Sequence, residues 1–113
     1  MHIRNTTRGT ELASSARAAR SMWSRMVGLL GRSSLGPGEA LLIEPCGSVH
    51  TAFMRFAIDV LYLDSANRVV KVVPRLRPFR VSGAASRTHA VIELPTGVID
   101  GTATAVGDEL TFD

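Results

Sequence analysis

The sequence has a single cysteine, few aromatic residues and no long apolar run. One cysteine, Cys46, excludes an internal disulfide and a zinc site built from cysteines alone. No apolar run approaches the roughly 18 residues that a membrane-spanning helix needs. The N-terminal residues lack the apolar segment of a secretory signal peptide. We therefore expect a cytoplasmic protein without a membrane span.

The length and the charge limit the classes of protein that need to be considered. A chain of 113 residues with 45% hydrophobic content is long enough for one domain with a modest core. Its formal net charge is +3, divided as +5 in residues 1–38, −3 in 39–64, +6 in 65–92 and −5 in 93–113. Segments that alternate in sign in this way are expected to pair across a compact fold. Nucleic-acid binding is therefore disfavoured, and few aromatic side chains are available to stack on bases.

Hydrophobic periodicity predicts one principal helix and several short strands. From about residue 13 to residue 30, apolar residues recur at helical spacing, namely Ala19, Met22, Trp23, Met26 and Leu30. Later residues form short apolar and β-branched runs, at 40–43, 49–56, 58–63, 69–73, 89–94 and 109–112. Residues 64–67 are typical of a hairpin loop. Pro74 and Pro78 either break the stretch that follows or confine it to an edge of the sheet. Residues 1–113 are thus predicted to form an α+β, β-rich single domain, with an antiparallel sheet or a small partly open barrel and one principal helix.

Residues 45–64 concentrate reactive side chains in apolar surroundings, and we predict a ligand-binding site there. If residues 49–56 are extended, His50 and Met54 share one face of the strand, and Thr51 and Arg55 share the other. His50 is then either a core residue bonded to the backbone, or a group that binds a ligand or acts in catalysis. The predicted binding residues are Cys46, His50, Thr51, Met54, Arg55, Asp59 and Glu93.

Nucleophilic catalysis is an alternative at the same place. Cys46 follows a proline at a turn, and His50 could lie close enough to lower the pKa of its thiol. The backbone N–H of Gly47 is a candidate oxyanion donor. The hydroxyls of Ser48 and Thr51 are alternative nucleophiles beside the same histidine. The competing interpretation of Cys46 is a small, buried apolar residue.

A metal site has weaker support in the sequence. In a straight strand, Cys46 and His50 would lie roughly 13 Å apart, which is too far for one ion. A third ligand would have to come from Asp59, Glu93 or His89, and no metal-binding motif occurs in the chain. We therefore predict no metal site, and the sequence indicates no particular cofactor.

Asp59 is unusual because it lies within an apolar strand pattern, where a carboxylate without a partner is costly to bury. One interpretation is a clamp, in which Arg55 or backbone amides hold the carboxylate and fix a bend near residues 56–57. The other interpretation is the polar wall of a pocket. Glu93 also lies within an apolar strand pattern and permits the same two interpretations.

Residues 71–80 form the candidate surface for a partner. Lys71, Arg75, Arg77 and Arg80, with Phe79 and two prolines, could form a rigid loop that binds phosphate or an acidic protein. The alternative is an arginine-rich edge that the acidic C-terminal segment neutralises, and the charge pattern favours this alternative.

Seven short motifs occur in order along the chain: GLLGR at 28–32, GEALL at 38–42, SVHTAFMRF at 48–56, IDV at 58–60, LD at 63–64, ELPTG at 93–97 and GDEL at 107–110. By these motifs the chain resembles the domain-of-unknown-function 192 family of small bacterial and archaeal proteins. Ala52 and Ala57 depart from the family pattern, because many members carry a bulky aromatic residue and a proline there. The resemblance implies a small β-rich domain, and it implies no established activity, cofactor or substrate.

Three functional hypotheses follow from the sequence. The leading one is a non-catalytic binding module, with a pocket around His50, Met54 and Asp59 for a small ligand or a peptide. The second is a small hydrolase or transferase that uses His50 with Cys46 or a hydroxyl group. The third is weak nucleic-acid association through residues 71–80, which would be recognised by its steep dependence on salt.

Overall fold

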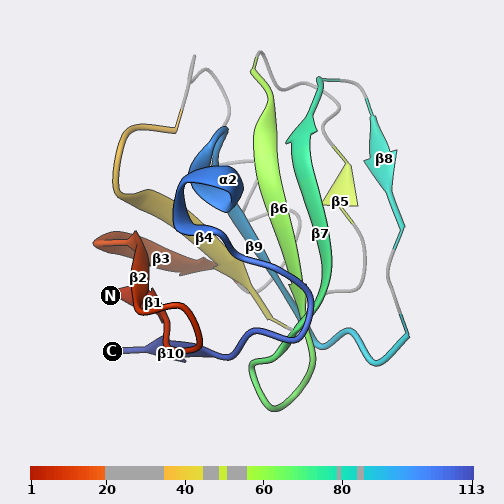
Figure 1. Ribbon diagram of the computed structural model, residues 1–113. Helices are drawn as coiled ribbons and strands as arrows, with labels where there is room; N and C mark the ends of the chain where they lie inside the picture. The colour runs from red at the N-terminus through yellow and green to blue at the C-terminus, as the bar shows by residue number, and fades with distance from the viewer. Residues whose placement is uncertain (20–34, 45–48, 51–55, 79, 84–85) are drawn as a thin grey trace.

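The computed structural model describes residues 1–19, 35–44, 49–50, 56–78, 80–83 and 86–113. These described residues form ten strands and one short helix (Figure 1). The elements are β1 (Ile3–Asn5), β2 (Thr10–Ala13), β3 (Ser15–Ala19), β4 (Glu39–Ile43), β5 (Val49–His50), β6 (Ile58–Leu63), β7 (Val69–Leu76), β8 (Val81–Ser82), β9 (Ala90–Pro95), α2 (Val98–Thr102) and β10 (Leu110–Phe112). The predicted α+β, β-rich fold is confirmed.

A five-stranded sheet with the order β3-β4-β9-β6-β7 organises the molecule. Its pairs are antiparallel except for β3 and β4, which are parallel. A three-stranded sheet of order β10-β1-β2 lies beside it and carries both chain termini, and β5 and β8 form a separate pair (Figure 1). The described strands do not close into a barrel. Of the two predicted arrangements, the open and largely antiparallel sheet is therefore the one observed.

The two faces of this sheet carry two different hydrophobic clusters. Residues opposite each other on neighbouring strands point to the same face, so the strand register sorts the side chains. The first face, here called the α2 face, includes Leu61, Leu63, Ile92 and Leu94, and it packs against β1, β2 and Ile99 of α2. The second, here called the Glu93 face, includes Leu41, Ile58, Val60, Tyr62 and Val91. Because both faces are covered, all six residues of β6 are buried and the strand shows no polar alternation.

The predicted strands and hairpin are largely confirmed. The runs at 40–43, 58–63, 69–73, 89–94 and 109–112 correspond to β4, β6, β7, β9 and β10. In the hairpin between β6 and β7, Asp64 Oδ1 accepts the backbone N–H groups of Ala66 and Arg68, each at 2.9 Å. Pro74 lies in β7, at the edge of the sheet as predicted. Of the predicted strand at 49–56, the structure describes β5 and Phe56, and the rest lies outside the described residues.

The predicted start of the helix near residue 13 is wrong. Ser15–Ala19 form β3, which pairs in parallel with β4, and Ala16 and Ala19 are buried. Alanine has a strong helix propensity, but the hydrogen bonds to β4 and the burial of these two side chains outweigh it. The remaining residues of the predicted helix face lie outside the described residues, namely Met22, Trp23, Met26 and Leu30.

Candidate functional site

The carboxylate of Asp59 is bound by three backbone amides. Its Oδ1 accepts the N–H of Arg75 at 3.0 Å. Its Oδ2 accepts the N–H groups of Gly97 at 3.1 Å and Ile99 at 2.9 Å. The side chain is fully buried on the α2 face, where this set of donors offsets the cost of removing a carboxylate from water.

These three amides belong to irregular parts of the backbone. The register between β6 and β7 shifts between Ile58 and Val60, and opposite this shift Arg75 has a positive φ of 52°. Gly97 has a φ of 96° and precedes α2, and Ile99 lies in the first turn of that helix. Asp59 therefore joins the bulge in β7 to the start of α2. A clamp made with backbone amides is thus observed, but its amides belong to β7 and the start of α2, whereas the prediction placed the clamp at a bend near residues 56–57. Arg55 lies outside the described residues.

Glu93 lies on the opposite face of the sheet from Asp59. In the register, Glu93 is opposite Val60 on β6 and Leu41 on β4, whereas Asp59 is opposite Leu94. Both acidic side chains are fully buried. The sheet separates them, so the structure does not bring Asp59 and Glu93 together in one pocket.

The strand that contains His50 is attached to the Glu93 face. Tyr62 projects from β6 on this face, and its hydroxyl group hydrogen-bonds to the carbonyl oxygen of Ser82 at 2.9 Å and to Ser82 Oγ at 2.6 Å. Ser82 is in β8, which pairs with β5 so that Val81 lies opposite His50. The predicted site residues Cys46, Thr51, Met54 and Arg55 lie outside the described residues. For His50, the backbone is described and the side chain is not.

The basic segment makes contacts within the protein. Lys71 Nζ donates to the carbonyl oxygen of Gly83 at 2.7 Å and lies 5.3 Å from the centre of the Tyr62 ring. Arg75 Nη2 forms an ion pair with Asp100 at 3.1 Å. Arg77 and Arg80 are exposed, and Phe79 lies outside the described residues.

Ion pairs connect the basic segments to the acidic C-terminal segment, as the charge pattern predicts. Arg8 Nε lies 3.0 Å from Asp108, and Arg68 Nη2 lies 3.4 Å from Glu109. Together with the pair between Arg75 and Asp100, they join residues far apart in the sequence. The ion pair of Arg75 with Asp100 supports the favoured interpretation of residues 71–80, in which the C-terminal segment neutralises a basic edge.

A buried polar network around Asp108 was not predicted from the sequence. Asp108 Oδ2 accepts Asn5 Nδ2 at 2.9 Å, Arg8 Nε at 3.0 Å and the backbone N–H of Ala105 at 3.0 Å. Burial by itself raises the pKa of Asp108, but these three hydrogen bonds outweigh it and hold the pKa below its usual value. The only signal in the sequence was the turn at residues 107–108, which gave no indication that Asn5 would be its partner.

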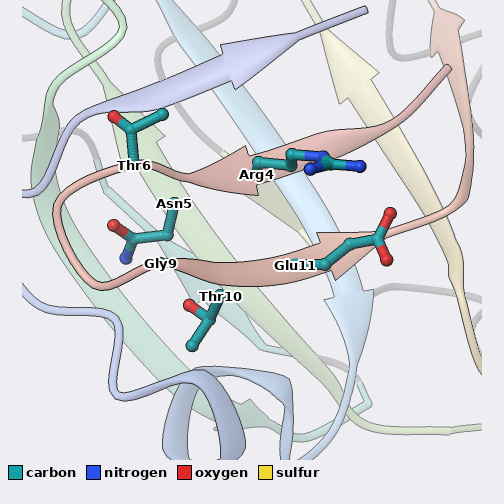
Figure 2. Close-up of a pocket in the computed structure, with 6 residues that line it drawn as sticks. All are labelled: Arg4, Asn5, Thr6, Gly9, Thr10 and Glu11. Carbon is teal, nitrogen blue, oxygen red and sulfur yellow. The ribbon is translucent and has the colours of Figure 1, made fainter.

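A hollow of about 340 Å³ lies along the hairpin of β1 and β2 (Figure 2). Its lining is Arg4, Asn5, Thr6, Gly9, Thr10 and Glu11, none of which was predicted as a site residue. Asn5 is engaged with Asp108, and the Thr10 hydroxyl donates to the carbonyl oxygen of Thr102 at 3.1 Å. Glu11 pairs with His2 at 2.6 Å. Because no predicted site residue lines it, the hairpin hollow does not account for the predicted site.

The described residues contain neither a metal-binding cluster nor a membrane-spanning helix. Across the described residues, no three His, Cys, Asp or Glu side chains lie close enough together to hold one metal ion. No helix in the described part of the chain is long and apolar enough to span a membrane.

Comparison with known proteins gives the family. The model of the domain-of-unknown-function 192 family, described as an uncharacterized ACR, matches residues 3–112, so the chain belongs to this family. A UPF0127 protein of Pyrococcus furiosus is 33% identical over 96% of this chain and 96% of its own length. This relative is archaeal and covers nearly the whole chain.

Two solved structures share the fold. A protein of unknown function from Novosphingobium aromaticivorans has a TM-score of 0.80 at 19% identity, and the match covers 98% of this chain and 82% of that chain. A protein from Sinorhizobium meliloti, for which a role as a transcription regulator is suggested, has a TM-score of 0.78 at 18% identity, over 97% of this chain and 89% of that chain. At these identities the likeness establishes the fold alone.

Proposed function

We propose that this protein is a non-catalytic binding module for a small organic ligand, and that its site lies on the Glu93 face of the sheet. The observation that carries the proposal is the attachment of the His50 strand to that face through Ser82 and Tyr62. Through this attachment the backbone of β5, at Val49 and His50, is joined to the side of the sheet that carries a fully buried carboxylate. Clefts that bind small molecules commonly combine an apolar lining with a few polar groups of this kind.

In this site Glu93, and not Asp59, is the acidic residue. Asp59 already accepts three backbone hydrogen bonds on the α2 face, and these explain its burial. Glu93 is two residues along β9 from Val91, and Val91 is opposite Tyr62. Residues two apart on a strand point to one face and lie roughly 7 Å apart, so Glu93 and Tyr62 are near neighbours on one buried face of the sheet.

The test is a binding screen of the whole chain against pools of metabolites and short peptides, followed by ligand-observed NMR. We expect a compound whose binding is lost in Glu93→Gln and in His50→Gln. Asp100→Asn is the matched control, because Asp100 is an exposed acid that lies away from the Glu93 face. A compound that binds equally to Glu93→Gln, His50→Gln and the control would contradict this location of the site.

The other two hypotheses gain less support. Catalysis by His50 would need a nucleophile within roughly 3.2 Å of the imidazole, and the candidate nucleophiles Cys46, Ser48 and Thr51 lie outside the described residues. Nucleic-acid association through residues 71–80 would need free cations, whereas Lys71 and Arg75 are engaged within the protein. The small-ligand module is therefore the function that the geometry supports best.

A further inference from the structure

A second hollow, of about 390 Å³, lies at one end of the five-stranded sheet. Three segments meet there: the hairpin between β6 and β7, residues 86–87, and the turn before β10 (Figure 1). The lining residues are Asp64, Arg68, Val69, Val70, Ser86, Arg87, Val106 and Gly107. A volume of this size is sufficient for a small metabolite.

Two arginines line this hollow, and neither is strongly bound by the protein. Arg68 reaches Glu109 at 3.4 Å, but both side chains are about half exposed, and such pairs contribute little. Arg87 has no hydrogen bond or ion pair within the described part of the chain. The acidic residue in the lining, Asp64, already accepts two backbone N–H groups through its Oδ1. The hollow is therefore lined by two arginines and by an aspartate whose carboxylate is partly satisfied.

The hollow also has an apolar side. Val106 is 62% exposed, and it lines the hollow together with Val69 and Val70. Arg87 has a φ of 68°, a conformation that is rare for a residue with a long side chain and that occurs preferentially at functional positions. The two arginines and the exposed valine thus line the same hollow.

We propose that this hollow binds a small organic anion, with its carboxylate or phosphate held by Arg68 and Arg87. Guanidinium groups suit this task, because their parallel N–H donors match two oxygens of one anionic group. The Ser86 hydroxyl supplies a further donor, and the apolar part of the ligand packs against Val106. This site is separate from the Glu93 face and goes beyond the function proposed above.

The test is an NMR titration of the backbone amides of the whole chain with acetate, isovalerate and inorganic phosphate. We expect saturable shifts confined to residues 68–70, 86–87 and 106–107, and tighter binding of isovalerate than of acetate because of Val106. Arg87→Gln and Arg68→Gln should each weaken binding by roughly tenfold, as expected for one charge-assisted contact. A preference for phosphate over both carboxylates would identify the anionic group as a phosphate.

Arg17→Gln is the matched control, because Arg17 is an exposed arginine on β3 that does not line this hollow. Binding should be unchanged in Arg17→Gln and in Glu93→Gln, which separates this site from the Glu93 face. Shifts that fail to saturate with all three anions, or equal binding by wild type and Arg87→Gln, would overturn the proposal.

Discussion

The carboxylate of Asp59 accepts the backbone N–H of Arg75 at 3.0 Å, at the point where β7 bulges away from β6. The same carboxylate binds the amides of Gly97 and Ile99, so one side chain holds an edge strand and a helix start together. The acidic residue that stands out most clearly in the sequence thus has a structural task. The other buried acid of the sheet, Glu93, lies on the opposite face.

Replacing Asp59 should strongly destabilise the protein. In Asp59→Ala, three backbone amides lose their hydrogen-bond acceptor. Because these amides are at least partly removed from water, we expect the free energy of unfolding to fall by about 3 kcal/mol. Asp59→Asn retains one carbonyl oxygen, so a smaller loss is expected. Urea denaturation of each variant measures these changes.

Asp100→Asn provides the control for Asp59, since it removes an exposed carboxylate from α2, the helix whose start Asp59 binds. It loses only the surface pair with Arg75, which is worth about 0.5 kcal/mol. If Asp59→Ala costs no more than Asp100→Asn, the clamp contributes nothing to stability and the account of Asp59 is wrong.

Two glycines in and beside α2 should respond in opposite ways to alanine. A Cβ atom added at Gly97 or at Gly101 meets nothing within 4 Å, so steric contact does not distinguish them. Gly97 has a φ of 96°, which alanine adopts at a cost of about 1–2 kcal/mol. Gly101 lies within the helix, where alanine is favoured by about 0.5–1 kcal/mol. Thermal unfolding should show Gly97→Ala below the wild type and Gly101→Ala at or above it; the reverse order would refute this explanation.

Asp108 should contribute to stability in a pH-dependent manner. Its folded-state pKa is depressed by the hydrogen bonds from Asn5, Ala105 and Arg8, which outweigh the opposing effect of burial. The contribution is therefore fully present above the unfolded-state pKa of about 3.9 and is lost as the pH falls through the lower folded-state value.

The measurement is urea unfolding of the wild type and of Asp108→Asn, from neutral pH down to roughly pH 2. The stability difference between the two proteins should be largest above about pH 4 and should shrink in more acidic solution. Asp113→Asn, at an exposed position, serves as the control. A difference that stays constant over the whole range would show that the Asp108 charge is not responsible.

Tyr62→Phe should loosen β8 and, with it, β5. The variant loses the hydrogen bonds to the Ser82 carbonyl oxygen and to Ser82 Oγ, for which we expect a cost of about 1–2 kcal/mol. Amide hydrogen exchange should accelerate at Val81 and Ser82 more than in β4. Ser82→Ala keeps the carbonyl acceptor and should have the smaller effect. Unchanged exchange in β8 would mean that Tyr62 does not hold it in place.

The strands with strong local signals were predictable from the sequence. The apolar run of β6, the hairpin at Asp64 and the edge position of Pro74 all follow from residue preferences that act over a few positions. The strand β3 was not predictable, because its alanines favour a helix and only pairing with β4 makes it a strand. Short elements such as β1 and α2 carry too few residues for a clear periodicity.

The candidate site was predictable only as a set of residue types. The sequence indicates that buried carboxylates occur at Asp59 and Glu93, but register decides which face each one occupies. The partners of Asp59 are backbone amides of β7 and α2, and every residue except proline carries such a donor. Similarly, the contact between Asn5 and Asp108 joins the two ends of the chain, so no local pattern reveals it.

The most direct test of the proposed site is an NMR titration of the His50 imidazole with pH, in the presence and absence of pooled metabolites and divalent metals. We expect one organic compound to change the titration of His50 in the wild type and to have no such effect in Glu93→Gln. A His50 titration that is the same with every pool, or that responds equally in both proteins, would contradict a ligand site shared by His50 and Glu93.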